Sequence, residues 1–543
     1  MTATNGTAIE GGKTGIAPVI MASTHQPEPP QVQAINASID GLGDIVTLYF
    51  DGPLSGTPAA SAFSITQDGP QAIAAIMVTG NRITLRLAEP LAKNAPVTAS
   101  FDGTGLDQAA AFSALSVNNR LDLSPTGRIS FGPPRGIALD GAEIAAFDPA
   151  SHRIFVASDN GLHVVQMNPD LSMVSLGTVS LGTNAMTSVA VTSGVAAVAV
   201  VAADKTQPGT VYFLDTGGPV SAAAVLGQVT VGALPDMVTF TPDGTRLLVA
   251  NEGEIAKDGT DPVGSVSVVD LSAGITAATV QTAGFEAFND RIDELKAAGV
   301  RLFAGEAGFE NTTVAQDLEP EYIAVSPDGT TAFVTLQENN AIAILDIASA
   351  TITAIQPLGL KSFDGLPADF SDRDGGIVLK TDNPVFGQFM PDSIASFTGV
   401  DERTYFVIAN EGDDRNDFLP GFLGGFEETV RVSELTLDPA AFPEAAALQD
   451  DANLGRLKVS RAPGNDGDEN GDGAVERLLT YGARSFSILD ANGVIIFDSG
   501  SHIEQFAARG GLYDPATNTG LFDDRRSPEK GPEPEGITTG VLG

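Results

Sequence analysis

The sequence predicts an all-β protein: a β-propeller of about seven blades, the last one incomplete, preceded by a small β-sandwich domain. A short phrase of Pro, an acid and an apolar run occurs four times, at Pro235, Pro320, Pro391 and Pro534. A Pro-Asp-Gly turn between two β-rich runs follows two of these phrases, which is typical of a hairpin. A unit this short cannot bury its own apolar face, so its recurrence indicates blades packed around a common axis.

The composition agrees with a loop-rich β protein, because the 543 residues include 60 Gly, 33 Pro and no Trp. The absence of Cys excludes disulfides, thiolate metal sites and Cys nucleophiles. The four His show no zinc-ligand spacing. With 29 Lys and Arg against 69 Asp and Glu, the formal charge is −40. That charge disfavours nucleic acid and anionic lipid as partners and favours hard cations such as Ca²⁺.

No run approaches about 20 consecutive apolar residues, so no membrane span is expected. The first six residues lack the basic start and apolar core of a Sec-type signal peptide. An acidic, cysteine-free chain without a cleavable leader is a common type among proteins exported by other routes. We therefore expect an extracellular or cell-surface protein exported without a Sec-type signal peptide, with a cytoplasmic location as the alternative.

The first 122 residues divide into two parts. Residues 1–30 are rich in Gly, Thr and Pro and are expected to form a flexible segment. Residues 31–122 are expected to form an immunoglobulin-like β-sandwich, because short alternating runs are separated by turn residues at 45–50, 62–66, 82–87 and 96–101. In its strand pattern this module resembles the SwmB-type repeat of bacterial surface proteins.

Residues 123–543 are expected to form the propeller. The first four blades are predicted at 142–167, 188–215, 237–269 and 322–347. A fifth begins at 393, a sixth includes 485–498, and a seventh begins at 535. Long insertions are expected at 280–318, where the residues before Gly299 predict a helix, and at 358–390 and 412–475. Long insertions on a rigid scaffold are where binding sites are usually built.

Carboxylates recur at equivalent positions of the blades. An acid directly follows the second strand of three blades, and each Pro-acid pair opens a blade. Such positions converge at one mouth of the channel, and oxygen ligands suit Ca²⁺ or Mg²⁺. The alternative is that they are strand-end acids exposed to solvent. The candidate metal ligands are Asp236, Glu252, Glu254, Glu321, Glu338, Asp392, Glu411, Asp413, Glu533 and Glu535.

A second motif, at 465–473, places side-chain oxygens at alternate positions, with Gly residues that let the chain wrap a cation. It matches the front half of a Ca²⁺ loop, although Leu479 stands where an EF-hand has its bidentate Glu. A plain Asp/Gly turn is the alternative. The candidate ligands are Asp466, Asp468, Asn470, Asp472 and Glu476.

Basic residues occur among these acids. Arg in an acidic cleft is either an ion-pair strut or a clamp for phosphate or carboxylate. Arg415 and Arg484 are the candidate catalytic residues on the second interpretation. The sequence contains no convincing G-x-S-x-G elbow, P-loop or G-x-G-x-x-G motif.

Several longer motifs resemble the choice-of-anchor I family, including 316–326, 409–415, 428–432, 453–459, 481–488 and 531–536. These are secreted or surface-anchored bacterial propellers, some described as atypical alkaline phosphatases. The resemblance covers about 130–543 and draws attention to Glu319, Glu321, Glu411, Asp413, Arg415, Arg484, Glu533 and Glu535. The chain departs from the family at 527–530, where an acidic run is usual, and it stops where the last blade would continue.

The first functional expectation is therefore an extracellular, calcium-binding propeller that hydrolyses phosphoesters. Ca²⁺, with room for a second divalent metal, would polarise the phosphoryl oxygens and activate a water, while Arg415 or Arg484 would stabilise the developing charge. The alternative is a non-catalytic, calcium-stabilised surface protein for adhesion or assembly. Its partners would be other surface proteins or a segment that completes the last blade. No nucleophile or general base can be named from the sequence.

Overall fold

The computed structural model describes residues 32–39, 45–50, 54–67, 69–79, 82–88, 91, 96–107, 109–117, 142–168, 173–182, 184–416, 426–514 and 520–540. The segment expected to be flexible, 1–30, and the expected domain boundary at 122 lie outside these residues. The chain divides into two compact units, 1–129 with 541–543, and 130–540. Each unit is described by itself below.

The first unit contains two four-stranded antiparallel sheets, ordered β1-β2-β7-β6 and β10-β8-β4-β5. Alternate residues of β7 and β8 are buried, and both sheets contribute to one apolar core that includes Leu48, Phe63 and Phe101. The two sheets therefore bury their apolar faces against each other. The elements are β1 (Ala34–Ile39), β2 (Ile45–Phe50), β3 (Ser55–Gly56), η1 (Ala60–Ala62), β4 (Phe63–Thr66), β5 (Pro70–Gln71), β6 (Ile73–Thr79), β7 (Arg82–Leu87), β8 (Val97–Phe101), β9 (Leu106–Asp107) and β10 (Phe112–Val117).

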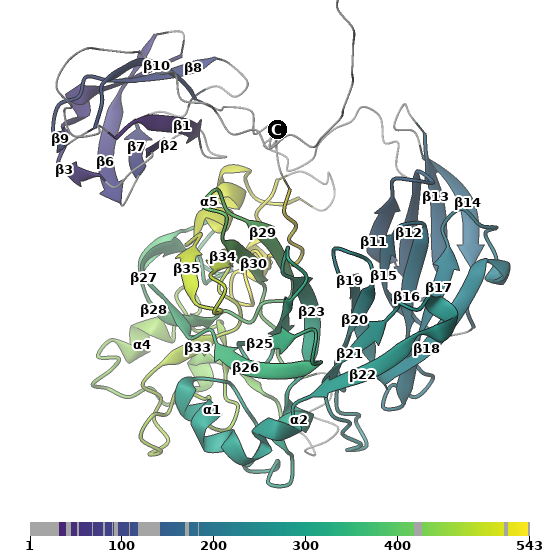
Figure 1. Ribbon diagram of the computed structural model, residues 1–543. Helices are drawn as coiled ribbons and strands as arrows, with labels where there is room; N and C mark the ends of the chain where they lie inside the picture. The colour runs from purple at the N-terminus through teal and green to yellow at the C-terminus, as the bar shows by residue number, and fades with distance from the viewer. Residues whose placement is uncertain are drawn as a thin grey trace, which may run out of the picture. The chain divides into compact units, whose positions relative to one another are not determined.

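The second unit contains five four-stranded antiparallel sheets among its described residues, and successive strands of the chain form the first four of them (Figure 1). The first two are β11 (Ala142–Asp148), β12 (Arg153–Ser158), β13 (Leu162–Met167) and β14 (Met173–Val179), then β15 (Met186–Thr192), β16 (Val195–Val200), β17 (Pro208–Asp215) and β18 (Val225–Ala233). The next two are β19 (Pro235–Phe240), β20 (Arg246–Asn251), β21 (Ser265–Asp270) and β22 (Thr279–Gly284), then β23 (Pro320–Val325), β24 (Thr331–Leu336), β25 (Ala341–Asp346) and β26 (Thr351–Pro357). The fifth is β29 (Ile394–Thr398), β30 (Thr404–Asn410), β34 (Ser485–Leu489) and β35 (Ile495–Asp498).

The first strands of these sheets pack on one another in order, β11 on β15, β15 on β19, β19 on β23 and β23 on β29. This succession of innermost strands is the arrangement of propeller blades. The predicted Pro-Asp-Gly turns join the first two strands of blades three and four. In the first of them Gly244 has a φ of +69°, and Asp243 Oδ1 accepts a hydrogen bond from the Thr245 N–H at 3.0 Å. The turn therefore requires both the glycine and the aspartate of the motif.

The expected sixth blade is wrong. Its two strands are β34 and β35, which complete the fifth blade by pairing β34 with β30. The chain leaves this blade after β30, forms a long insertion and returns at β34. A local strand pattern cannot reveal that a blade is split in this way. In the part of the chain that the structure describes, five four-stranded blades are present.

The start of the expected seventh blade lies against β29. The Ser393 hydroxyl donates a hydrogen bond to the backbone oxygen of Glu535, and the Thr539 hydroxyl donates one to Ser396 O at 2.7 Å. The C-terminal segment therefore runs beside the innermost strand of the fifth blade.

The insertions and the segment after β35 contain their own elements. They are η4 (Glu286–Arg291), α1 (Ile292–Ala298), α2 (Val314–Asp317), β27 (Leu360–Ala368), β28 (Lys380–Gln388), β31 (Thr429–Arg431), η5 (Val432–Glu434), α4 (Ala445–Leu448), β32 (Lys458–Ser460), β33 (Leu478–Thr480), α5 (His502–Arg509) and η6 (Asp524–Arg526). Short turns η2 (Ala222–Ala224) and η3 (Ile275–Ala277) lie within blades. The predicted helix before Gly299 is α1, and Gly299 ends it in the left-handed conformation. Strands β27, β28 and β33 form a separate sheet with its own apolar core.

Blades four and five are joined by an aromatic pair. The rings of Phe333 and Phe406 stack with centroids 3.7 Å apart and planes at 5°, and both side chains are fully buried. We predict that Phe333→Ala lowers the free energy of unfolding of the propeller by about 3–5 kcal/mol, because the substitution leaves a cavity between two blades. Urea unfolding followed by circular dichroism measures the loss. Phe147→Ala is the control, since Phe147 is 43% exposed. An equal loss in both variants would contradict the prediction.

Candidate functional site

The acids predicted from the blade repeat converge at one end of the propeller because of strand pairing. In each blade the first and second strands are antiparallel, so the start of the first strand lies beside the end of the second. Pro235 pairs with Asn251 in blade three, and Pro320 pairs with Leu336 in blade four. The Pro-acid residues and the acids after the second strand are therefore neighbours within each blade.

A cavity of about 250 Å³ lies where these acids meet. It is lined by Glu252, Glu254, Glu319, Glu321, Gln337, Glu338, Asp413, Asp414 and Arg415. We call this cavity the acidic pocket. The structure thus brings together six of the predicted metal ligands and one of the predicted catalytic residues. The prediction missed Gln337 and Asp414, although both adjoin predicted residues in the sequence and that adjacency is the signal that could have found them.

Burial dominates the electrostatics of the pocket. It raises the pKa of Glu338 to about 7, although Arg415 partly offsets the effect. Burial likewise raises the pKa of Glu252 and Glu321, with further contributions from neighbouring carboxylates. Glu338 Oε2 is buried and has no hydrogen-bond partner among the described residues. These carboxyl groups cannot all carry a negative charge at neutral pH unless a cation or protons compensate them.

Further predicted ligands surround the pocket without lining it. The pKa of Asp392 is raised to about 7 by burial and then by Glu411, Glu535 and other acids. The pKa of Asp236 is raised to about 6 by burial and by Glu143. Glu411 accepts a hydrogen bond from Gln337 Nε2 at 3.1 Å, which connects this second group of acids to the pocket.

Arg415 is held firmly at the pocket wall. Its guanidinium forms ion pairs with Asp317 at 2.6 Å and Glu319 at 2.9 Å, and it lies over the Phe303 ring at 5.0 Å. Its backbone N–H donates to Glu428 at 2.7 Å. The residue is therefore an ion-pair strut that also lines the pocket, and its role as a clamp for phosphate or carboxylate stays a prediction.

Arg484, the other candidate catalytic residue, is not among the residues that line the acidic pocket. The side chain is completely buried and pairs with Glu504 at 3.0 Å. It also donates to Asp369 O and Ser527 O, each at 2.6 Å, and lies over the Phe370 ring at 4.1 Å. These contacts tie the insertion at 358–390 to the C-terminal segment.

Four other predicted ligands have cationic partners. Glu533 does not line the pocket and pairs with Arg526 at 2.6 Å. Glu254, which does line it, forms an ion pair with Lys205. Lys530 lies 3.0 Å from Asp413 and 4.0 Å from Glu411. These pairs reduce the negative charge at the rim, whereas Glu252, Glu321 and Glu338 form no ion pair with any residue that the structure describes.

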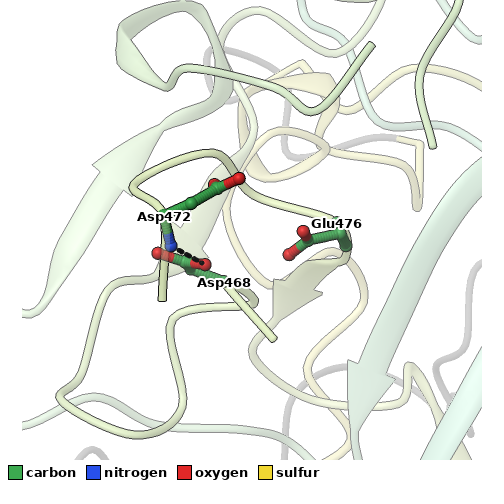
Figure 2. Close-up of side chains that lie close together, drawn as sticks. All are labelled: Asp468, Asp472 and Glu476. Atoms are coloured by element: carbon green, nitrogen blue, oxygen red, sulfur yellow. Dashed lines mark hydrogen bonds between the residues drawn. The ribbon is translucent and has the colours of Figure 1, made fainter. Parts of the chain in front are cut away.

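The predicted calcium loop brings three carboxylates together (Figure 2). Ligand oxygens of Asp468, Asp472 and Glu476 all lie within 4.8 Å of one another. Glu476 supplies the third carboxylate in place of the absent EF-hand Glu. Among the described residues, no other three acids have ligand oxygens this close together.

Backbone N–H groups shape the same loop. Gly471 and Gly473 donate to the Asp468 carboxylate at 2.7 and 2.8 Å. Asp466 accepts from the Asp468 N–H at 3.2 Å, and the Asn470 amide donates to Glu476. Asp466 and Asn470 therefore support the loop here, whereas Asp468, Asp472 and Glu476 present oxygens to one point.

The blades and the pocket together define a β-propeller with a carboxylate-lined mouth. The chain belongs to the family described as the choice-of-anchor I domain, whose model matches residues 143–543. No helix among the described residues is long and apolar enough to cross a membrane.

Relatives and solved structures are also similar to this chain. A "Mesenchyme-specific cell surface glycoprotein" of Strongylocentrotus purpuratus is 29% identical over 294 residues, which cover 48% of this chain and 37% of that protein. The propeller domain of Cps50 (Swd1) of Myceliophteria thermophila is 7% identical with a TM-score of 0.31 and covers 69% of this chain and 93% of that one. A Lactobacillus plantarum protein is 12% identical with a TM-score of 0.31 and covers 70% of this chain and 78% of that one.

The raised pKa values predict how stability depends on pH in the absence of divalent cations. Between about pH 4 and pH 7 the folded protein holds protons that the unfolded chain has released, so the free energy of unfolding falls as pH rises and then levels off. We predict that Glu338→Gln stabilises the cation-free protein at pH 8 by about 2 kcal/mol, because the amide carries no buried charge. Chemical unfolding in chelator at pH 5 and pH 8 measures this.

Glu434→Gln is the control, since Glu434 is exposed. We expect that variant to keep the wild-type pH dependence. A wild-type protein that becomes more stable from pH 5 to pH 8 in chelator would contradict the prediction.

Proposed function

We propose that this protein is an extracellular or cell-surface β-propeller that binds divalent cations, with Ca²⁺ as the favoured ion. The observation that carries the proposal is the convergence of Asp468, Asp472 and Glu476, whose ligand oxygens lie within 4.8 Å of one another. Oxygens on opposite sides of one Ca²⁺ are about 5 Å apart, so the three carboxylates can share one ion. Their all-oxygen chemistry favours a hard cation over zinc or copper.

The acidic pocket supports a second cation. Its buried glutamates need a compensating charge, and Glu338 Oε2 has no hydrogen-bond partner among the described residues. The described pocket carboxylates do not approach one another in threes within 4.8 Å. An ion in the acidic pocket would therefore be coordinated partly by water molecules, or the carboxylates would move toward it. A second divalent metal such as Mg²⁺ fits this description, because it usually keeps several waters.

A surface location follows from two similarities. The family is named for its choice of anchor, and the sea urchin relative is by name a cell surface glycoprotein. The net charge of −40 suits a surface exposed to abundant cations and disfavours nucleic acid as a partner. Other surface proteins, or a segment that adds strands beside the C-terminal residues, are the expected macromolecular partners.

Calcium counting tests the loop. We predict that Asp472→Asn and Glu476→Gln each remove one bound Ca²⁺ from the full chain, because each removes a charged ligand from the same ion. Native mass spectrometry of protein equilibrated with Ca²⁺ gives the count. Asp490→Asn is the matched control, since Asp490 caps an ordinary hairpin turn through the Asn492 N–H at 2.8 Å. An unchanged count in both loop variants would refute calcium binding at this loop.

Phosphoester hydrolysis is the second candidate function. Arg415 lines the pocket, and its Nε has no hydrogen-bond partner among the residues described. A metal in the pocket would polarise a phosphoryl oxygen and lower the pKa of a bound water, and Arg415 would stabilise developing negative charge. Asp413, whose side chain is 46% exposed, gives the pocket contact with solvent.

An assay with p-nitrophenyl phosphate tests this second candidate. We predict metal-dependent turnover at alkaline pH that chelator abolishes, and a decrease of at least about tenfold in Glu338→Gln, since metal-supported steps contribute several kcal/mol. Asp490→Asn is again the control. No turnover with any divalent metal would remove the hydrolase and leave the calcium-binding surface protein.

A further inference from the structure

A second cavity is lined by the loop that joins β27 to β28, by β28 and by residues 447–454. It has a volume of about 200 Å³ and shares no lining residue with the acidic pocket. Its walls include Asp369, Asp374 and Lys380, which lie in or beside the loop that joins β27 to β28. No ligand was assigned to this loop from the sequence.

Two of the three aspartates in this loop have partners. Asp369 accepts hydrogen bonds from the N–H groups of Ser371 at 3.1 Å and Val378 at 2.7 Å. Asp372 forms a two-point ion pair with Arg456 at 2.6 and 3.3 Å. These contacts fix the loop and satisfy both carboxylates, so neither needs a further ligand.

Asp374 is different. Its side chain is only 9% exposed, and neither of its carboxylate oxygens has a hydrogen bond of good geometry among the described residues. Burial raises the pKa of Asp374, although the Lys380 ammonium and the N–H groups of Asp374 and Gly376 oppose this shift. The ammonium of Lys380 is 3.9 Å away and donates instead to Ala452 O at 3.0 Å and Asn453 Oδ1 at 2.9 Å. A buried carboxylate with two unsatisfied oxygens is costly unless something else binds it.

A second carboxylate in the same condition comes from the C-terminal segment. Asp524 Oδ1 is buried without a hydrogen-bond partner in the described structure. Arg484 brings the two segments together, since it donates to Asp369 O and to Ser527 O, each at 2.6 Å. Asp524 and Ser527 belong to one turn, closed by a 3.1 Å backbone hydrogen bond. Burial raises the pKa of Asp524, and Asp374 is the next contributor.

We infer that Asp374 and Asp524 bind one divalent cation of the calcium type. Three bare carboxylate oxygens from two segments 150 residues apart supply part of the six to eight oxygens, roughly, that Ca²⁺ takes, and water in the cavity supplies others. The ion fastens the C-terminal segment at 520–533 to the loop at 369–376. This site is separate from the acidic pocket and from the loop at 466–476.

Metal counting on the full chain tests the inference. Asp374→Asn and Asp524→Asn are each expected to lower by one the number of Ca²⁺ ions seen by native mass spectrometry at pH 8. The double variant is expected to lose the same single ion, because both residues bind it. Asp372→Asn is the matched control: it removes a charge from the same loop, breaks the pair with Arg456 and is expected to keep the wild-type count. Asp472→Asn loses a different ion, so this test does not depend on the proposed calcium loop.

Hydrogen exchange supplies a second measurement. In the wild-type protein, chelator is expected to increase exchange at 520–533, and in Asp374→Asn exchange there is expected to be fast with or without Ca²⁺. Wild-type metal counts in both Asp374→Asn and Asp524→Asn would overturn the inference. A raised melting temperature of the cation-free Asp374→Asn protein, together with an unchanged response to Ca²⁺, would also overturn it and would identify a proton as the compensating charge.

Discussion

Repulsion between buried carboxylates is the constraint on which this propeller depends. The blade repeat places an acid at the start of one strand and another after the next strand, and antiparallel pairing makes them neighbours. Repetition around the axis then gathers acids in one pocket. Solvent relieves these charges only in part, because burial is the leading cause of the raised pKa values. Any stable form of the protein must therefore supply positive charge or protons at this place.

The blades supply the acids, and the insertions supply the fixed cations. Arg301 belongs to the insertion between blades three and four, pairs with Glu428 and donates to Glu338 O at 2.9 Å. Arg415 belongs to the insertion that splits blade five and pairs with Asp317 and Glu319. The insertions therefore do more than connect the strands of the blades. Their arginines hold them to the mouth of the propeller and partly neutralise it.

The sequence predicted the convergence of the acids because that convergence follows from repetition and strand pairing, which are local and periodic. It also predicted that acids of the loop at 466–476 come together, because these residues are close in the chain. It could not distinguish Arg484 from Arg415, because the difference is tertiary: Arg484 meets Glu504 in the core, whereas Arg415 faces the pocket. It also assigned β34 and β35 to a sixth blade, since strand patterns do not reveal that an insertion interrupts a blade.

The same limit explains why the pair Asp374 and Asp524 carries no signal in the sequence. Neither residue stands out among 69 acids, and what distinguishes them is burial without a hydrogen-bond partner in the described structure. Asp369 and Asp372 share the loop with Asp374 and are satisfied by backbone N–H groups and by Arg456. Where a chain has many more acids than bases, fixed cations cannot satisfy every buried carboxylate. The unsatisfied ones are the places where we propose that a mobile cation supplies the charge that a basic side chain supplies elsewhere.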